Sequence, residues 1–368
     1  MRSFLDALSE KPPFLDESVG WNAPALLGEI LSLETLEERA TALAAHLTLA
    51  RESKRGGRAH LDRLERNMER LRSAYLALAD DVHRGEPLAP AAEWLLDNFH
   101  LLESEARAVR HDLPPRYYRK LPKLASREHA GTARLYAMAV ELIRSGDGRL
   151  DLERLTRFLK AYQTVAPLTI GELWAWPSIL KLALLENLRR LSDGLLARRQ
   201  GRRAADEIRA RLERGDHAVP LPKALDPAFV AQLLSHMREF DPRLSAQRAE
   251  LTRCLAENGT TAEDAVRAEH QRLATEQASM ANSITSLRLV SAMDWSLYVE
   301  SVSLIEQILR RDPAGVYGRM DFESRDLYRH AVEELADPTG EAQVRVALRA
   351  VESARRAAEG PRSKERVK

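Results

Sequence analysis

Apolar residues recur along most of this chain at alternating spacings of three and four positions, the period of one face of an α-helix. The clearest example is a coiled-coil type stripe made of Leu61, Leu64, Met68, Leu71, Tyr75, Leu78 and Val82. No window shows sustained alternation of apolar and polar residues between turn residues, which is the pattern of a strand. The sequence therefore predicts an all-α protein, a multi-helix array of long antiparallel helices.

Capping residues set several of the expected helix starts. Asp151, Thr169 and Thr261 each precede a helical pattern and can accept a hydrogen bond from its first turn. Thr35 with Glu38 fits a capping box inside the first helical region, 23–53, and favours two helices there. Further helices are expected at about 91–111, 128–144, 227–240, 244–256, 261–290, 322–336 and 341–359.

Glycine and proline residues divide this helical pattern into two parts. Gly215, Pro220, Pro222 and the Asp226-Pro227 pair fall within one short stretch, which we interpret as a linker. The predicted organisation is an irregular segment at 1–22, helical subdomains at 23–214 and 227–359 joined by a linker at 215–226, and a disordered tail at 360–368.

A weak internal sequence repeat is compatible with a helical-repeat arrangement. The pattern Arg-x-Asp followed by Tyr-x-Arg occurs twice, each time after a long helical stretch that contains tryptophan and glutamate. The two copies are Arg110, Asp112, Tyr117, Arg119 and Arg310, Asp312, Tyr317, Arg319. Coincidence in an arginine-rich helical protein is the favoured explanation.

Charge and cysteine content narrow the class of protein. The chain carries 56 Lys and Arg against 55 Asp and Glu, and this balance argues against a dedicated nucleic-acid surface. The single cysteine, Cys254, cannot form an intramolecular disulfide, and no Cys/His cluster has zinc-ligand spacing. We therefore expect no metal, no cofactor and a reducing compartment.

Membrane features are weak. The N-terminus has no apolar core of the kind found in signal peptides, and the most apolar stretch, 173–185, is too short to span a bilayer. The arginine-rich section that follows, 189–203, would suit an anionic lipid surface. A solvated face paired with acids such as Asp193, Asp206 and Glu207 is the favoured alternative.

No phosphate-binding motif is apparent. The chain contains neither GxGxxG nor GxxxxGK[ST], and no Asp-x-Asp that would hold a metal ion on a sugar nucleotide. The adjacent pair Asp80-Asp81 closes a heptad-like helix, where we expect both carboxylates to be solvated.

Residues 93–125 concentrate the candidate polar chemistry. Trp94, Asn98, His100 and Glu103 lie on one predicted helix, and the last two share a face. His100 and Glu103 would suit an acid/base pair or two metal ligands, but the sequence names no further ligand. A buried hydrogen bond between them at a helix contact is therefore the favoured interpretation.

Tyrosines are the best candidates for contact with a ligand. Tyr117 and Tyr118 follow Pro114-Pro115, so a stiff backbone holds their rings at a turn, where they would suit stacking on a sugar. A structural ring wedged between helices is the commoner outcome. Tyr317 and Arg319 fall within 309–335, in a loop between two predicted helices that would grip a carboxylate, a phosphate or a helix end, or serve as a rigid turn.

Three long strings carry a family resemblance. They are PAAEWLLDNFHLLESEARAVRHDLPPRYYRKLPKLA, RFLKAYQTVAPLTIGELWAWPSILKLALLENLRRL and SLIEQILRRDPAGVYGRMDFESRDLYRHAVEELA. They resemble the N-terminal region of bacterial cyclic β-1,2-glucan synthases, large inner-membrane enzymes in which a membrane-embedded glucosyltransferase domain that uses UDP-glucose follows this region. The resemblance spans about 31–358 and implies that this chain is a fragment or a separate subunit of such a synthase.

Three functions are compatible with these observations. The resemblance implies a cytoplasmic helical scaffold at the inner face of the inner membrane, partnered by the glucosyltransferase part, with at most peripheral membrane contact and no catalytic residue to carry over. A glycan-binding adaptor would contact β-1,2-glucan in trans. A free-standing enzyme would place its site near His100, Glu103 and Tyr117. The candidate contact residues are Trp94, Asn98, His100, Glu103, Tyr117, Tyr118, Tyr317 and Arg319.

Overall fold

The computed structural model describes residues 30–50, 57–125, 131–216, 219–222, 225–237 and 245–359, with only the backbone described at 245–247. Within these ranges every regular element is a helix, and pairing of extended backbone is limited to two isolated bridges, Leu49 with Leu124 and Lys123 with Ala133. The all-α prediction is confirmed. The segment expected to be irregular, 1–22, and the expected tail, 360–368, lie outside the described residues.

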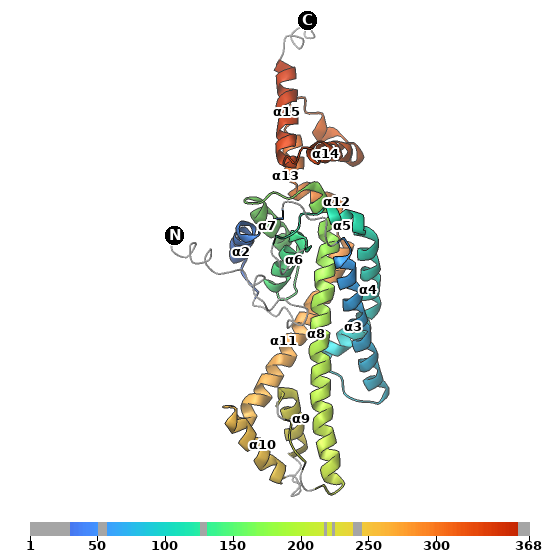
Figure 1. Cartoon of the computed structure of the whole chain (residues 1–368), viewed down its shortest axis with the longest axis vertical. Coiled ribbons are helices and arrows are strands. Elements are labelled where there is room, and N and C mark those ends of the chain that lie inside the picture. Colours follow the sequence, from blue (N-terminus) through green and yellow to red (C-terminus); the bar gives the residue numbers. More distant parts are fainter. Residues whose placement is uncertain are drawn as a thin grey trace.

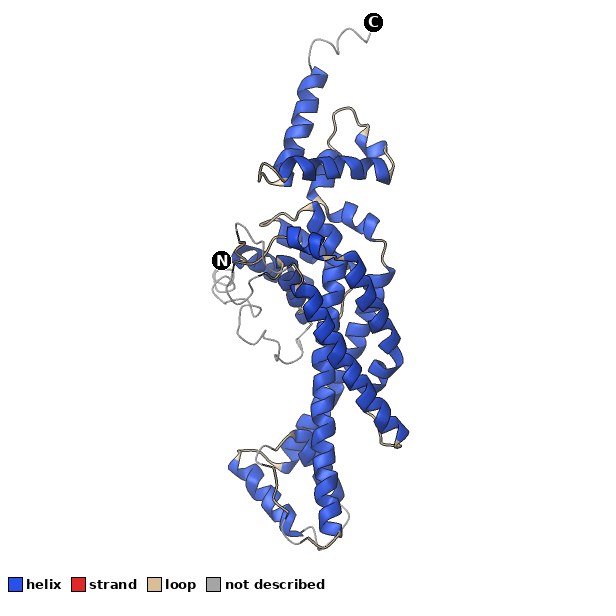
Figure 2. Cartoon of the chain, turned by 45° about the vertical axis from the view of Figure 1, so that its right-hand side comes forward, coloured by secondary structure: helices blue, strands red, loops and turns tan. Residues whose placement is uncertain are grey.

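Figure 1 shows an elongated molecule, with α15 at one end and α9 and α10 at the other; Figure 2 shows helices throughout its length. The helices of the first half are α2 (Leu33–His46), α3 (Ala59–His83), α4 (Pro90–Asp112), α5 (Pro115–Lys120), α6 (Arg134–Arg144), α7 (Leu152–Gln163) and α8 (Ile170–Glu213). Those of the second half are α9 (Pro227–Met237), α10 (Ser245–Glu257), α11 (Ala262–Ala292), α12 (Trp295–Val302), α13 (Leu304–Leu309), the short 3₁₀ helix η4 (Tyr317–Arg319), α14 (Phe322–Ala336) and α15 (Gln343–Glu359).

Helix α8 is the axis on which the others pack. It runs for 44 residues and is capped by Thr169, as the sequence predicts. The structure adds a capping box, in which Thr169 and Glu172 bond to each other's backbone amides. Small residues allow close packing along it. A Cβ on Gly201 would lie 3.3 Å from the backbone nitrogen of Phe229, so glycine lets α9 approach α8 closely.

The apolar interior forms three clusters, and α8 contributes to all of them. The main core is formed by α2 to α8 together with α11 and α12. The distal cluster joins the end of α8 to α9, α10 and the start of α11. The cap cluster joins Ile170, at the start of α8, to α13, η4, α14 and α15. The predicted boundary at 215–226 separates α8 from α9, which pack against each other, and the two-subdomain division stays a prediction.

Two local expectations are corrected by the structure. The cap of α2 is Ser32, whose hydroxyl accepts the amide of Thr35, so Thr35 lies inside the first turn and does not start a second helix.

Asp81, expected to be solvated, is 1% exposed. Its two oxygens receive the guanidinium of Arg199 at 2.6 and 2.7 Å, and Arg203 donates to one of them. A bidentate partner compensates this burial.

The arginine-rich section of α8 faces the protein more than solvent. Arg189, Arg190 and Arg198 are buried, and each pairs with a carboxylate. Arg198 reaches Glu276 of α11 at 2.6 Å, and Arg190 reaches Glu186 at 2.7 Å. The expected pairing with acids is observed, but the expected solvated face is wrong for these three arginines, because they are buried. The sequence pattern missed this because several partners come from distant helices.

Candidate functional site

A pocket of about 420 Å³ opens where α5, the first turns of α8 and α14 meet. We call it the junction pocket. It is lined by Tyr117, Lys120, Ile170, Gly171, Trp174, Asp326, His330 and Glu333. It lies between the main core and the cap cluster, and Trp174 packs against both. Because of this position, the shape of the pocket depends on how the two clusters are arranged.

Two aromatic rings form one side of the junction pocket. The hydroxyl of Tyr117 donates to the carbonyl of Gly171 at 2.6 Å, which fixes the ring against the start of α8. Burial and the nearby carboxylates of Glu333 and Glu172 raise the pKa of Tyr117, so its hydroxyl stays protonated as a donor. Trp174 meets Phe322 edge to face, with ring centroids 6.2 Å apart.

Helix α14 supplies the polar side of the pocket. Asp326, His330 and Glu333 are spaced by four and three positions, so they project from one face of this helix. Asp326 accepts two bonds from Arg329, at 3.0 and 3.1 Å, and its carbonyl lies 2.9 Å from Nδ1 of His330. Among the described residues, Glu333 takes part in no ion pair.

Buried charges lie on both sides of the pocket. On the α8 side, Arg134 donates to both oxygens of Glu172, at 2.5 and 2.6 Å, and Glu172 also accepts the amide of Thr169. Both charged side chains are at most 6% exposed. Because burial without a partner would be costly, this bidentate pair fixes where α8 begins relative to α6.

On the other side, the cap contains a network of three arginines and two glutamates with Tyr317, which we call the cap network. Arg329 bridges Glu300 at 2.9 Å and Glu306 at 2.8 Å. Arg325 pairs with the other oxygen of Glu300, and Arg310 pairs with the other oxygen of Glu306. Tyr317 donates to Glu306 at 2.7 Å, and burial, together with this contact, raises the pKa of Tyr317.

The residues of α4 singled out from the sequence are engaged with separate partners. Trp94 is partly buried against the main core, and the buried amide of Asn98 donates to the Trp94 carbonyl at 2.8 Å and accepts from Arg288. Glu103 pairs with Arg72 at 2.5 Å, and His100 is exposed. The expected hydrogen bond between His100 and Glu103 is not among the contacts of the described residues. Their roles as contact residues stay predictions.

The remaining candidates are also engaged with separate partners. Tyr118 is 3% exposed, and its hydroxyl accepts the amide of Ala133 at 3.1 Å. Tyr317 belongs to the cap network, and the exposed Arg319 donates to the carbonyl of Gly315 at 2.9 Å. Tyr117 therefore stands as the candidate that lines the junction pocket.

Sequence reasoning missed the other residues of the junction pocket. Trp174 packs in two clusters and also borders the pocket. The spacing of Asp326, His330 and Glu333 was a detectable signal, since three titratable residues share one helix face. Nothing in the sequence placed that face opposite Tyr117.

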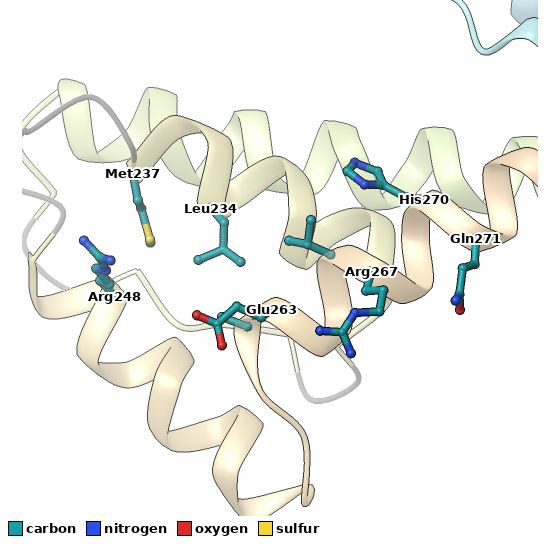
Figure 3. Close-up of a pocket in the computed structure, with 9 residues that line it drawn as sticks. Leu234, Met237, Arg248, Glu263, Arg267, His270 and Gln271 are labelled. Carbon is teal, nitrogen blue, oxygen red and sulfur yellow. The ribbon is translucent and has the colours of Figure 1, made fainter.

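A second pocket, of about 610 Å³, lies between α9, α10 and α11; we call it the distal pocket. It is lined by Leu234, Met237, Arg248, Ala262, Glu263, Val266, Arg267, His270 and Gln271. Figure 3 shows Leu234 and Met237 directed from α9 toward the space that Arg248 and Glu263 border. It contains none of the residues singled out from the sequence, and it offers side chains of both charges around an apolar floor.

The described part of the chain shows neither a cluster of metal ligands nor a helix suited to crossing a membrane. No group of three or more His, Cys, Asp and Glu side chains in the described ranges is arranged to hold a metal ion. Likewise, none of the helices in those ranges combines the length and the apolar character that crossing a bilayer requires.

The chain matches no protein-family model. It is 37% identical over 305 residues to the cyclic beta-(1,2)-glucan synthase NdvB of Rhizobium meliloti (strain 1021). The aligned part covers 79% of this chain and 11% of that protein, so the chain spans about a tenth of the length of this relative. The resemblance stated from the sequence is thereby confirmed, and this chain is homologous to a segment of a cyclic β-1,2-glucan synthase.

Proposed function

We propose that this chain is the helical accessory segment of a cyclic β-1,2-glucan synthase, corresponding to its N-terminal region. In this proposal it holds the glucosyltransferase part, on the same polypeptide or on a separate chain, and glucosyl transfer from UDP-glucose takes place on that part. The homology to about a tenth of a glucan synthase carries the proposal. The internal engagement of Asn98, Glu103, Tyr118 and Tyr317 supports a structural role for these side chains.

The outward side of α14 supports a docking role. Leu327, Tyr328 and Leu335 are 72%, 51% and 62% exposed, and their spacing places them on one helix face, which we call the outer face of α14. A concentration of exposed large apolar side chains on one helix marks an interaction surface. We propose the glucosyltransferase part as its occupant, because the relative devotes nearly nine tenths of its length to sequence beyond the matched segment.

The experiment is co-purification of the tagged chain with the glucosyltransferase part of a glucan synthase. We expect the wild-type chain to retain its partner, and the double variant Leu327→Asp/Leu335→Asp to lose at least about tenfold in affinity through desolvated charges. The matched control is Leu76→Asp/Leu152→Asp, because these leucines are 60% and 56% exposed on other helices. A wild-type chain without partner, or equal losses in both variants, would contradict the proposal.

Two further expectations belong to this proposal. The chain is placed at the inner face of the inner membrane through its partner, with peripheral lipid contact at most. A free-standing enzyme near His100, Glu103 and Tyr117 is the competing function, and it predicts UDP release from UDP-glucose by the chain alone. The glycan-binding alternative is favoured by a specific feature, the junction pocket, and is developed next.

A further inference from the structure

We propose that the junction pocket binds a neutral saccharide chain, specifically a stretch of linear β-1,2-linked glucan. This inference rests on the proposed function for the identity of the sugar. The binding chemistry is argued from the pocket itself, whose two aromatic rings and polar side chains come from three separate helices. Accordingly, the accessory segment would bind two partners, the glucan and the transferase part.

The aromatic side of the pocket suits the apolar face of a sugar ring. A pyranose presents C–H groups on its faces, and these pack favourably on aromatic rings, as apolar surface does in general. Tyr117 is held by its hydrogen bond to Gly171, and Trp174 by its edge-to-face contact with Phe322. Because both rings are already fixed, binding costs little side-chain entropy.

The polar side suits hydroxyl groups, which both donate and accept hydrogen bonds. Glu333 offers a carboxylate with no ion-pair partner among the described residues, while Lys120 and His330 offer donors. This mixture of acceptors and donors matches a polyhydroxylated ligand. The carboxylate of Glu333 would repel a phosphate, so the pocket is expected to bind UDP-glucose itself more weakly.

The size of the pocket and its opening agree with this ligand class. A volume of about 420 Å³ falls within the range of small-molecule sites, roughly 300–1,000 Å³. Gly171 keeps the space between the two sides free. A Cβ added there would lie 3.5 Å from Oε1 of Glu333 and 3.7 Å from Cε2 of Tyr117, between the two groups proposed to contact the sugar.

The test is calorimetric titration of the 368-residue chain with linear β-1,2-linked glucose oligosaccharides, with an α-1,4-linked oligosaccharide and UDP-glucose as comparison ligands. We expect binding of the β-1,2-linked chain and at least about tenfold weaker binding of UDP-glucose. The key variant is Glu333→Gln, expected to weaken binding three- to about tenfold through loss of a charged acceptor. Its matched control is Glu334→Gln, which changes the exposed neighbouring residue and is expected to bind as wild type.

A second variant separates binding from folding. Gly171→Ala has room for its Cβ and gains helix propensity, so we expect the folded chain to keep or raise its melting temperature. The added methyl group narrows the gap between Glu333 and Tyr117, so the affinity for glucan is expected to fall by at least about threefold. Absence of glucan binding by the wild-type chain, or wild-type affinity in both Glu333→Gln and Gly171→Ala, would overturn the inference.

The failure of this inference can be told apart from failure of the proposed function. Glu333→Gln is expected to leave co-purification with the transferase part unchanged, because Glu333 faces the pocket and not the outer face of α14. Leu327→Asp/Leu335→Asp is expected to leave glucan affinity unchanged for the same reason. If the chain binds the transferase part but not glucan, only the glucan-binding inference is contradicted. If it binds glucan but not the transferase part, only the docking function is contradicted.

Discussion

Two regions on either side of the junction pocket bury charge in opposite ways. Near α5, Lys123 is 2% exposed, donates to the carbonyl of Tyr118, and has its ammonium 3.4 Å from the centroid of the Tyr118 ring. In the cap, Glu300 and Glu306 are surrounded by Arg310, Arg325 and Arg329. The first region buries a single base that forms no ion pair with any residue the structure describes. The second buries a network whose charges are compensated.

The comparison shows which buried groups stay charged near neutral pH. Burial lowers the pKa of Lys123 to about 7, and the distant carboxylate of Glu172 only partly offsets this. Burial alone would raise the pKa of Glu300, but hydrogen bonds from Arg325 and Arg329 outweigh it and lower that pKa. The base near α5 can therefore lose its proton near neutral pH, while Glu300 keeps its negative charge.

The largest expected effect comes from breaking the compensated region. Arg329→Met removes the side chain that joins Glu300 to the fully buried Glu306. Leaving a buried carboxylate undercompensated is expected to cost about 3–5 kcal/mol of unfolding free energy, measured by urea denaturation. Arg349→Met is the control, because this arginine also pairs with a glutamate, Glu341, but is 70% exposed, and the expected cost is under about 1 kcal/mol. Similar losses of unfolding free energy in both variants would show that the buried ion pairs stabilise the chain no more than an exposed pair does.

Removing the uncompensated charge should have the opposite sign. Lys123→Met fills similar space without a charge, and we expect it to stabilise the chain by about 2 kcal/mol at pH 7. The folded pKa of Lys123, about 7, lies below its ordinary value of 10.5, so the unfolded chain holds more protons between these pH values. Wild-type stability should therefore rise with pH across this window, and the advantage of the variant should shrink.

The measurement is urea unfolding of wild type and Lys123→Met at pH 7 and pH 10. Lys120→Met is the control, because Lys120 is 68% exposed and its removal should change little at either pH. A variant that is less stable than wild type at pH 7 would show that the contacts of Lys123 outweigh its desolvation.

Acid should act on the cap in its own pH window. The folded pKa of Glu300 is depressed below 4.5, so its contribution is present above that pH and is lost as pH falls below it. The protection factors of amide hydrogen exchange in α14 and α15, which correct for the intrinsic pH dependence of exchange, should therefore fall below about pH 4.5 in wild type. The effect should be smaller than that of Arg329→Met, and Glu300→Gln should flatten the pH dependence. An unchanged profile in Glu300→Gln would assign the acid sensitivity to another carboxylate.

The smallest expected effect concerns the helix start that lies between the two regions. Thr169→Ala removes the hydroxyl that accepts the amide of Glu172, while the pair between Glu172 and Arg134 remains. The loss should be about 1 kcal/mol in urea unfolding. Thr275→Ala is the control, because that hydroxyl bonds the carbonyl of Gln271 within α11 and caps nothing, so a change within about 0.5 kcal/mol is expected.

Short-range features of the fold could be predicted because they depend on neighbouring residues. Asp151, Thr169 and Thr261 cap helices as expected, each accepting the amide three residues ahead. The range expected for α14, 322–336, agrees with the structure. In each case a polar cap and a periodic apolar pattern lie within one window of sequence, so no tertiary contact is needed to recognise them.

Long-range pairing could not be predicted in the same way. Asp81 was expected to be solvated because its partner, Arg199, lies 118 positions away. Tyr117 was singled out because two prolines precede it, but the wall it faces belongs to α14, more than 200 positions further along the sequence. Without the packing of α5 and α14 on the start of α8, nothing in a single sequence indicates that these residues share a pocket.

The unbroken length of α8 has a mechanical consequence. Its 44 residues correspond to a rod of about 66 Å, with the junction pocket at its first turn and the distal pocket near its last. A tilt of about 5° at the first turn would displace the last turn by about 6 Å. The helix thus acts as a lever arm, and small rearrangements around the junction pocket would be magnified at the opposite end of the molecule.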